Sequence, residues 1–255
     1  MIQLYVLDID GCITYPFETP PWDVLTQVRD LQRQSLTNEP IPSLALCTGR
    51  PYPYTEAVAQ YLDIRYPVIF ESGGGLYEPV HSSIEISPHF DDDALREKRE
   101  ISRFVEEEVL PHYSTAYLEF AKYTDVGIVG NEKQDIIQMY EKIKEWVGEH
   151  YTDVEVHHTD VSVNVIRKAC NKAEGLKQLS QNTGIPLEQM AYIGDSSGDI
   201  KAMREAGVTL APANATPEVK STADYTMKGE ITHAVLEGYH LLMELNHKEL
   251  AEQRV

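Results

Sequence analysis

The sequence lacks a CxxC pair, a long apolar run and a cluster of basic residues. Its 255 residues include only three cysteines, Cys12, Cys47 and Cys170. An odd number without CxxC spacing argues against a disulfide framework or a structural zinc site. The first apolar run, 2–7, has no basic flank, and no stretch approaches the ~18 apolar residues of a membrane span. These absences predict a soluble, cytoplasmic protein without a membrane partner.

The charge is strongly unbalanced, because 22 basic residues face 41 acidic ones and leave a formal net charge of −19 at pH 7. Such an excess repels nucleic-acid phosphates and anionic lipids, so we expect no general nucleic-acid or membrane-surface binding. A small anion can bind only at a locally positive site. The apolar fraction of 42 % is enough for a core, and the length suits one large or two small domains.

The first part of the chain alternates predicted strands with predicted helices. The run 2–7 is apolar apart from Gln3 and ends at Asp-Ile-Asp-Gly, which is typical of a strand buried on both faces of a parallel sheet. Apolar spacing at 24–31, after two prolines, indicates an amphipathic helix. A strand at 43–47, a helix at 56–62 and a strand at 67–70 complete a β-α-β-α-β pattern. This pattern predicts a doubly wound sheet.

The pattern changes after the glycines at 73–75, where two helix-strand-strand units follow one another. We therefore predict an α-β-β-α-β-β insert, in which two helices cover one face of an antiparallel sheet. Its predicted elements are a helix at 93–109, strands at 115–120 and 126–129, a helix at 132–147, and strands at 154–157 and 161–166.

The α/β alternation resumes at Lys172. The fold class predicted for the whole chain is α/β, with a doubly wound parallel-sheet core, Rossmann-like, and an inserted α+β cap. We assign residues 1–80 and 168–255 to the core and residues 81–167 to the cap. The later core elements are a helix from 172 to about 181, strands at 190–194 and 208–210, a helix at 199–206, a short strand near 225 and a long helix from about 231.

Polar residues gather where the predicted parallel strands end. Asp8 and Asp10 follow the first strand, Thr48 follows the second, and Asp195 and Asp199 follow a later one. Ligands bind beyond the carboxyl ends of such strands, so these side chains should converge. In a regular strand Asp8 and Asp10 would share a face, and two carboxylates that close need a cation or a shared proton. Four carboxylates suit Mg²⁺, although Asp199 is also placed to cap its helix.

Four polar segments stand in order along the chain: Asp8-Ile9-Asp10-Gly11, Thr48-Gly49-Arg50, Lys172, and Gly194-Asp195-Ser196-Ser197-Gly198-Asp199. Together they resemble the four motifs of the haloacid dehalogenase (HAD) superfamily. The predicted insert between the second and third segments resembles the cap of the Cof-type branch, which includes sucrose-phosphate phosphatases and archaeal phosphoglycolate phosphatases. The resemblance covers nearly the whole chain, and its specificity lies in the combination of motifs.

The resemblance implies a role for each of these residues. Asp8 would be the nucleophile that forms an aspartyl-phosphate, and Asp10 the general acid and then the general base. Thr48, Gly49 and Lys172 would bind the phosphate, and Arg50 is a candidate substrate contact. The metal Mg²⁺ would be held by Asp8, the backbone carbonyl of Asp10, Asp195 and, directly or through water, Asp199.

Two positions depart from the family pattern, because Gly198 and Ser72 stand where many relatives carry asparagine. These changes bear on substrate identity more than on catalysis. We expect a Mg²⁺-dependent phosphatase that hydrolyses a small phosphorylated metabolite, either a sugar phosphate or a phospho-acid such as phosphoglycolate. The alternatives are a phosphomutase with the same aspartates and a non-catalytic metabolite-binding regulator. The sequence leaves both a monomer and a homodimer open.

Overall fold

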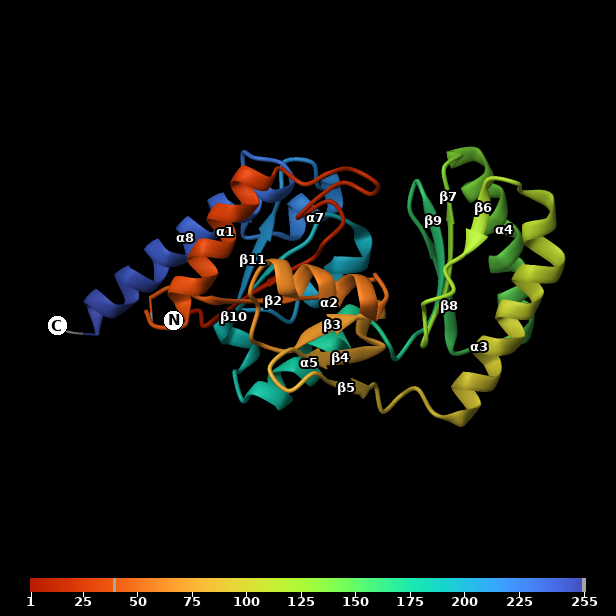
Figure 1. The fold of residues 1–255 in the computed structure, drawn as a ribbon, viewed down its shortest axis with the longest axis horizontal. Coiled ribbons are helices and arrows are strands. Elements are labelled where there is room, and N and C mark those ends of the chain that lie inside the picture. Colours follow the sequence, from red (N-terminus) through yellow and green to blue (C-terminus); the bar gives the residue numbers. More distant parts are fainter. Residues whose placement is uncertain (39, 254–255) are drawn as a thin grey trace. The chain divides into compact units, whose positions relative to one another are not determined.

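The computed structural model describes residues 1–38 and 40–253. The chain divides into two compact units, which are described separately (Figure 1). The core unit consists of Met1–Glu85 and Lys172–Val255, and the insert unit of Ile86–Asn171. The boundaries predicted from the sequence, at residues 80 and 168, lie a few residues before those of these units.

The insert unit has the predicted α-β-β-α-β-β order. Its four-stranded antiparallel sheet has the strand order β6-β7-β9-β8. Buried side chains from both helices and from β7, β8 and β9 form one hydrophobic cluster, so both helices pack on the same face of the sheet. The elements are α3 (Asp92–Phe104), β6 (Ala116–Leu118), β7 (Val126–Gly130), α4 (Lys133–His150), β8 (Val154–His158) and β9 (Ser162–Arg167).

The first helix of the insert differs from the prediction at its end. The regular α-helix α3 stops at Phe104, and a π-helical turn, Val105–Val109, continues it. Ile101, Val105 and Val109 are all buried in the insert cluster, as their spacing of four residues predicted. The periodicity therefore located the buried face correctly, although it did not reveal the wider turn.

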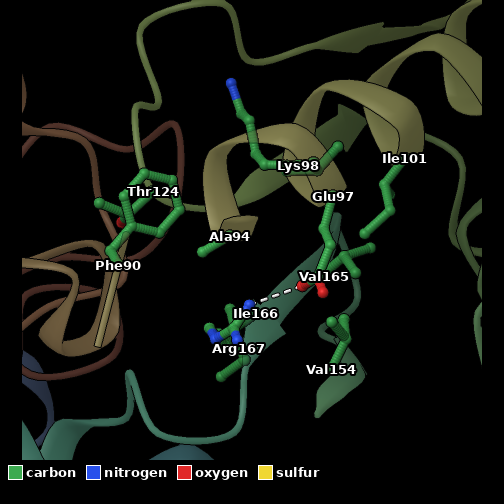
Figure 2. Close-up of a pocket in the computed structure, with 11 residues that line it drawn as sticks. Phe90, Ala94, Glu97, Lys98, Ile101, Thr124, Val154, Val165, Ile166 and Arg167 are labelled. Atoms are coloured by element: carbon green, nitrogen blue, oxygen red, sulfur yellow. Dashed lines mark hydrogen bonds and ion pairs between the residues drawn. The ribbon is translucent and has the colours of Figure 1, made fainter. Parts of the chain in front are cut away.

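The insert unit contains a pocket between α3 and the sheet (Figure 2). Its floor is apolar and includes Ala94, Ile101 and Val165. On its edge, Glu97 and Arg167 form an ion pair with an N–O distance of 2.6 Å. These two charges neutralise each other, and the remaining charged residue of the lining, Lys98, donates to the backbone carbonyl of Lys122 at 3.1 Å. The chemistry that the sequence predicts lies in the core unit.

The core unit is built on a five-stranded parallel sheet with the order β12-β11-β10-β1-β2. Every residue of β1, β2 and β10 is buried, which explains why these strands are apolar in the sequence apart from Ser43 of β2. From β1 the chain passes to β2 on one side and later to β10 on the other, so a topological switch point lies beside β1. The strands are β1 (Leu4–Leu7), β2 (Ser43–Leu46), β10 (Met190–Ile193), β11 (Val208–Ala211) and β12 (Tyr225–Thr226).

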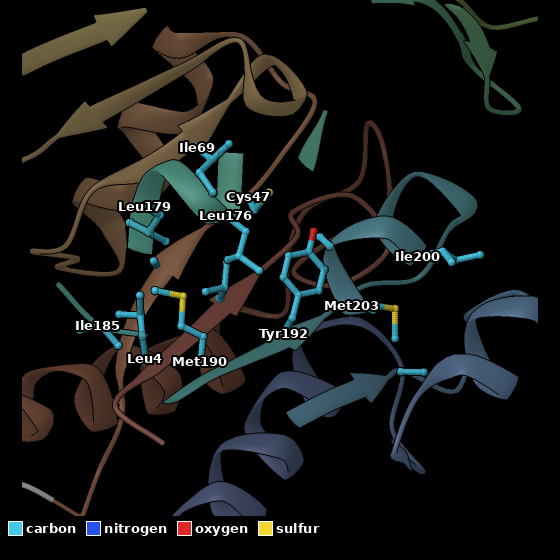
Figure 3. Close-up of a cluster of buried hydrophobic side chains, with 14 of the residues drawn as sticks. Leu4, Cys47, Ile69, Leu176, Leu179, Ile185, Met190, Tyr192, Ile200 and Met203 are labelled. Atoms are coloured by element: carbon cyan, nitrogen blue, oxygen red, sulfur yellow. The ribbon is translucent and has the colours of Figure 1, made fainter. Parts of the chain in front are cut away.

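Helices pack on both faces of this sheet. Leu4 of β1 belongs to a buried cluster with Leu176, Leu179 and Met203, which come from α5 and the end of α6 (Figure 3). Tyr5, the next residue of β1, instead packs edge-to-face against Tyr239 of α8. The doubly wound α/β core is thereby confirmed. The helices are α1 (Trp22–Ser35), α2 (Tyr52–Tyr61), α5 (Lys172–Thr183), α6 (Ile200–Met203), α7 (Pro217–Thr222) and α8 (Ile231–Glu252).

The third predicted strand is paired differently from the expectation. It forms β3 (Val68–Phe70) and belongs to a separate three-stranded sheet of order β3-β4-β5, with β4 at Gly75–Glu78 and β5 at Ser83–Ile86. A single parallel bridge between Cys47 and Ile69 joins it to the end of β2. The strands β4 and β5 were not predicted. β5 is largely exposed and shows no burial pattern, and β4, although mostly buried, begins at a glycine, a residue type that is depleted in strands.

Among the residues that the structure describes, no helix is both long and apolar enough to span a membrane.

Candidate active site

The site begins where β1 ends. Asp8 still belongs to the ladder of the sheet, since its backbone N–H donates to the carbonyl of Ile193 at 3.1 Å. Its side chain is buried, and Oδ1 accepts a hydrogen bond from the N–H of Ile9 at 2.7 Å. The last hydrogen bonds of the sheet and its own loop therefore fix the direction of this carboxylate.

Lys172 connects two of the predicted site residues. It is the first residue of α5, and its Nζ lies 2.8 Å from Asp8 Oδ2 and 2.7 Å from Asp199 Oδ1. Burial lowers the pKa of Lys172, but the charges of Asp199 and Asp8 outweigh burial and hold this pKa well above its usual value. The ammonium group is therefore a permanent positive charge inside the site.

Asp199 is held by protein donors on both of its oxygens. Besides Lys172, the hydroxyl of Tyr192 donates to Oδ1 at 2.8 Å. Oδ2 accepts the backbone N–H groups of Asp195 and Ser196 at 3.2 and 3.1 Å, and the hydroxyl of Ser196 at 3.2 Å. The side chain makes no capping hydrogen bond to α6 itself. It instead forms a capping box with Ser196 on the 3-10 turn Ser197–Asp199, which leads from the loop after β10 into the helix.

Two glycines allow the acidic loops to approach one another. Gly11 has a φ of +75°, and a Cβ on it would lie 2.1 Å from Oδ2 of Asp195. A Cβ on Gly194 would lie 2.4 Å from Cβ of Asp199. Any larger residue would collide at these positions, so the glycines permit the close packing of carboxylates at this edge of the sheet.

Three carboxylates form a group that fits a divalent cation. Asp8, Asp195 and Asp199 each offer an oxygen, and these oxygens lie within 4.8 Å of one another. Burial and the negative charge of Asp199 raise the pKa of Asp195 to about 7. Burial likewise raises the pKa of Asp8, although Lys172 opposes it. Hard oxygen donors with excess negative charge are the ligands that Mg²⁺ prefers, so the residues present fit this ion.

The carboxylate of Asp10 is not part of the group formed by Asp8, Asp195 and Asp199. The strand ends at Leu7, so the two side chains do not share the face of one regular strand, as the sequence suggested. The carboxylate of Asp10 instead pairs with Arg50, whose Nε donates to Oδ2 at 2.7 Å and whose Nη2 donates to Oδ1 at 2.6 Å. Arg50, a predicted substrate contact, thus binds the predicted general acid in this structure.

The predicted phosphate-binding loop follows β2. Thr48 is buried, and its N–H donates to the carbonyl of Ile69 at 3.1 Å. The N–H of Ser72 donates to the carbonyl of Thr48 at 2.9 Å, and a Cβ on Gly49 would lie 3.2 Å from the hydroxyl oxygen of Ser72. Ser72, which departs from the family pattern, therefore lies directly beside this loop. Ser72 has a φ of +54°, a backbone conformation that few side chains adopt.

Two residues near the site were not predicted from the sequence. Tyr192 looks like one more core residue of an apolar strand, and only the structure shows its hydroxyl on Asp199. Asn214 donates from Nδ2 to the carbonyl of Gly11 at 2.9 Å, and its Oδ1 accepts the N–H of Ile231 at 3.1 Å. Asn214 follows β11, so the rule that polar residues count at the ends of parallel strands would have found it.

A family model for haloacid dehalogenase-like hydrolases matches residues 76–238, which is more than half of the chain. The chain therefore belongs to the haloacid dehalogenase-like hydrolases. It is 26% identical over 245 residues to a phosphoglycolate phosphatase of Methanopyrus kandleri, covering 96% of this chain and 98% of the relative. It is 27% identical over 238 residues to a phosphoglycolate phosphatase of Methanococcoides burtonii, covering 93% and 95%.

Solved structures have the same fold at low identity. A Thermoplasma acidophilum protein gives a TM-score of 0.76 at 16% identity and covers 95% of this chain and 98% of its own. The sucrose-phosphatase of Synechocystis, solved with sucrose and phosphate, gives a TM-score of 0.65 at 19% identity, covering 95% and 98%. The predicted family and fold class are therefore confirmed, and the enzyme is a hydrolase.

Proposed function

We propose that this hydrolase is a Mg²⁺-dependent phosphatase that acts on a small phosphorylated metabolite through an aspartyl-phosphate on Asp8. The observation that carries the proposal is Lys172, whose Nζ bridges Asp8 and Asp199 beside Asp195 at the carboxyl end of the sheet. Relatives named phosphoglycolate phosphatase support a phospho-acid substrate. A sugar phosphate is the other candidate, because the fold is similar to that of a sucrose-phosphatase.

Asp8 is suited to the role of nucleophile. One oxygen is held by a backbone N–H and the other by Lys172, so the carboxylate is already oriented before substrate binds. In the first step an oxygen of Asp8 bonds to phosphorus, the bond to the leaving alcohol breaks, and Asp10 supplies the proton to that alcohol. In the second step water attacks phosphorus and Asp10 takes its proton. The bond between phosphorus and the Asp8 oxygen breaks, which frees inorganic phosphate and regenerates the carboxylate of Asp8.

The other residues bind and orient the phosphoryl group. Lys172 is the point charge that neutralises its oxygens, and Thr48 and Gly49 donate hydrogen bonds to them. Asp8, Asp195 and the backbone carbonyl of Asp10 would hold Mg²⁺, which supplies Lewis-acid stabilisation of the phosphoryl oxygens when bound. Each oxygen of Asp199 accepts at least two hydrogen bonds from the protein, whereas each oxygen of Asp8 has one such donor, so we assign Asp199 to orienting Lys172 and to contact with the ion through water.

We also propose that the two units correspond to the catalytic core and the cap of a Cof-type hydrolase. All the residues proposed for chemistry lie in the core unit. The insert unit, Ile86–Asn171, has the α-β-β-α-β-β order that the resemblance implies for a cap.

A panel of phosphorylated metabolites tests the proposed activity. With Mg²⁺ present, we expect the wild-type enzyme to release inorganic phosphate from at least one sugar phosphate or phospho-acid, and EDTA to abolish that release. Free phosphate is measured colorimetrically, and sugar phosphates are examined for isomerisation. Isomerised sugar phosphate without phosphate release would identify a phosphomutase. Tight binding of one compound without any turnover would identify a regulatory protein.

The raised pKa of Asp195 gives a second prediction, on metal binding and pH. Its pKa is about 7 in the folded protein against an ordinary value of 3.8, so folding favours the protonated form. Without metal, the stability linked to this group is complete below about pH 4 and is lost as the pH rises through 7. Mg²⁺ competes with the proton, so its addition should raise the Tm more at pH 8 than at pH 5.5, measured by thermal unfolding with and without EDTA.

The variant that tests this prediction is Asp195→Asn, which removes both the titrating charge and one proposed metal ligand. The variant should lose most of the Mg²⁺-dependent rise in Tm at both pH values. Equal rises at pH 5.5 and pH 8 in the wild type, or an undiminished rise in the variant, would contradict metal binding by Asp195.

A further inference from the structure

Arg50 and Asp10 form a bidentate ion pair, as described above. Two parallel N–H···O bonds of 2.7 and 2.6 Å match the planar fork of a guanidinium to the plane of one carboxylate. The guanidinium also lies 5.0 Å from the centre of the Tyr54 ring, and the arginine side chain is only 19% exposed. Arg50 is therefore held in place as a receptor for a carboxylate, in partly desolvated surroundings.

The position of Arg50 relative to the phosphate-binding loop limits the ligand that it can take. Its backbone N–H donates to the hydroxyl of Thr48 at 3.1 Å, and its carbonyl accepts the N–H of Glu71 at 3.0 Å. The residue thus follows directly on Thr48 and Gly49, which are proposed to bind the phosphate. A ligand that reaches both needs its carboxylate a short distance from its phosphate.

The ion pair is also incompatible with the role of general acid that is proposed for Asp10. As general acid, Asp10 must face the leaving oxygen, but Arg50 holds both of its oxygens here. The Nε/Nη2 edge of one guanidinium engages one carboxylate in this bidentate way at a time. A second carboxylate that takes this edge must therefore release Asp10.

On the basis of the proposed phosphatase function, we propose that Arg50 binds the carboxylate of a short phosphorylated carboxylic acid and releases Asp10 in exchange. The substrate's carboxylate then occupies the fork that Asp10 occupies in this structure. Arg50 acts as a specificity-determining residue, because a phosphate ester without a carboxylate lacks the group that displaces Asp10. Binding of the correct substrate and release of the catalytic acid become one event.

The test compares two esters that differ in one group. 2-Phosphoglycolate has a carboxylate where 2-hydroxyethyl phosphate has an alcohol. For the wild-type enzyme with Mg²⁺ we expect kcat/KM to favour 2-phosphoglycolate by about 10- to 100-fold, the range of a charge-assisted bidentate contact. Arg50→Gln should reduce this ratio toward one. Arg50→Lys, which keeps the charge without the fork, should give an intermediate ratio.

The matched control is Arg33→Gln, which removes an arginine from an ion pair with Asp63 at 3.0 Å outside the site. Its ratio should equal that of the wild type. A ratio for Arg50→Gln and Arg50→Lys that also equals the wild-type value would overturn the proposal.

A binding measurement separates recognition from turnover. In an Asp8→Asn background, which lacks the nucleophile, calorimetry should show that Arg50→Gln weakens binding of 2-phosphoglycolate about 10- to 100-fold more than binding of 2-hydroxyethyl phosphate. Equal weakening of both esters would overturn the proposed role of Arg50. If the wild type hydrolyses other phosphate esters but shows no preference for 2-phosphoglycolate, this inference fails and the phosphatase stands. If it hydrolyses none, the proposed function itself fails.

Discussion

Replacement of Lys172 by methionine is expected to abolish hydrolysis and to lower the free energy of unfolding by about 3–5 kcal/mol, the cost of removing one partner of a buried ion pair. The Nζ of Lys172 lies within 2.8 Å of oxygens on both Asp8 and Asp199, and these three side chains are almost completely buried. Methionine fills a similar volume, so the change tests the charge more than the packing. Urea unfolding in EDTA and phosphate release with Mg²⁺ measure the two effects.

The same helix provides the control. Lys177, also in α5, forms ion pairs with Glu174 at 3.0 Å and Glu205 at 3.3 Å, and its side chain is 36% exposed. Surface pairs of this kind contribute little, so Lys177→Met should change both stability and activity only slightly.

The pH dependence gives Lys172→Met a second signature. Burial raises the pKa of Asp8 and the charge of Lys172 opposes that rise, so in this variant Asp8 takes up a proton at a higher pH than in the wild type. The deficit in stability should shrink as the pH falls below neutrality. The double variant Asp8→Asn/Lys172→Met should recover part of the lost stability, because one uncompensated carboxylate is gone. Equal stabilities of Lys172→Met and wild type at neutral pH would refute the account of a charged, buried lysine.

The sequence predicted the parts of the fold in which burial leaves a local pattern. β1, β2 and β10 are buried throughout and read as short apolar runs, and the helices of the insert follow the spacing of their buried faces. β5 is largely exposed, so it left no such pattern and was missed together with β4. The pairing of β3 with β4 was not predicted either, because the residues of a strand do not by themselves determine which other strand it pairs with.

The site residues also fall into those that the sequence predicts and those that only the folded structure reveals. Asp8, Thr48 and Asp195 follow buried strands, so their place at one edge of the sheet is a consequence of parallel topology. The partner of Asp10 was not predictable, because Arg50 lies 40 positions away and the pair depends on where two loops end. The hydroxyl of Tyr192 was hidden for the opposite reason, since an aromatic residue in an apolar strand is ordinarily explained by packing alone.

Asp8→Asn should reduce phosphate release by at least about a thousandfold, because removing a residue that acts as part of a catalytic unit costs most of the rate that the unit provides. The asparagine keeps the shape of the side chain, and its oxygen can still accept the N–H of Ile9 that now bonds to Asp8 at 2.7 Å. The variant loses the carboxylate that is proposed to attack phosphorus, and an amide is a poor nucleophile at that position.

The same change should leave the Tm of the metal-free protein equal to or above that of the wild type. Three carboxylates surround one lysine in this site, and burial raises the pKa of Asp8, so the ionised side chain opposes folding. Asp63→Asn is the control: Asp63 forms ion pairs with Arg33 and Arg65 outside the site, and the variant should keep wild-type activity. Phosphate release and thermal unfolding in EDTA are measured for both. Sustained turnover by Asp8→Asn would show that water attacks the ester directly, and a large fall in its Tm would show that Asp8 is a structural residue.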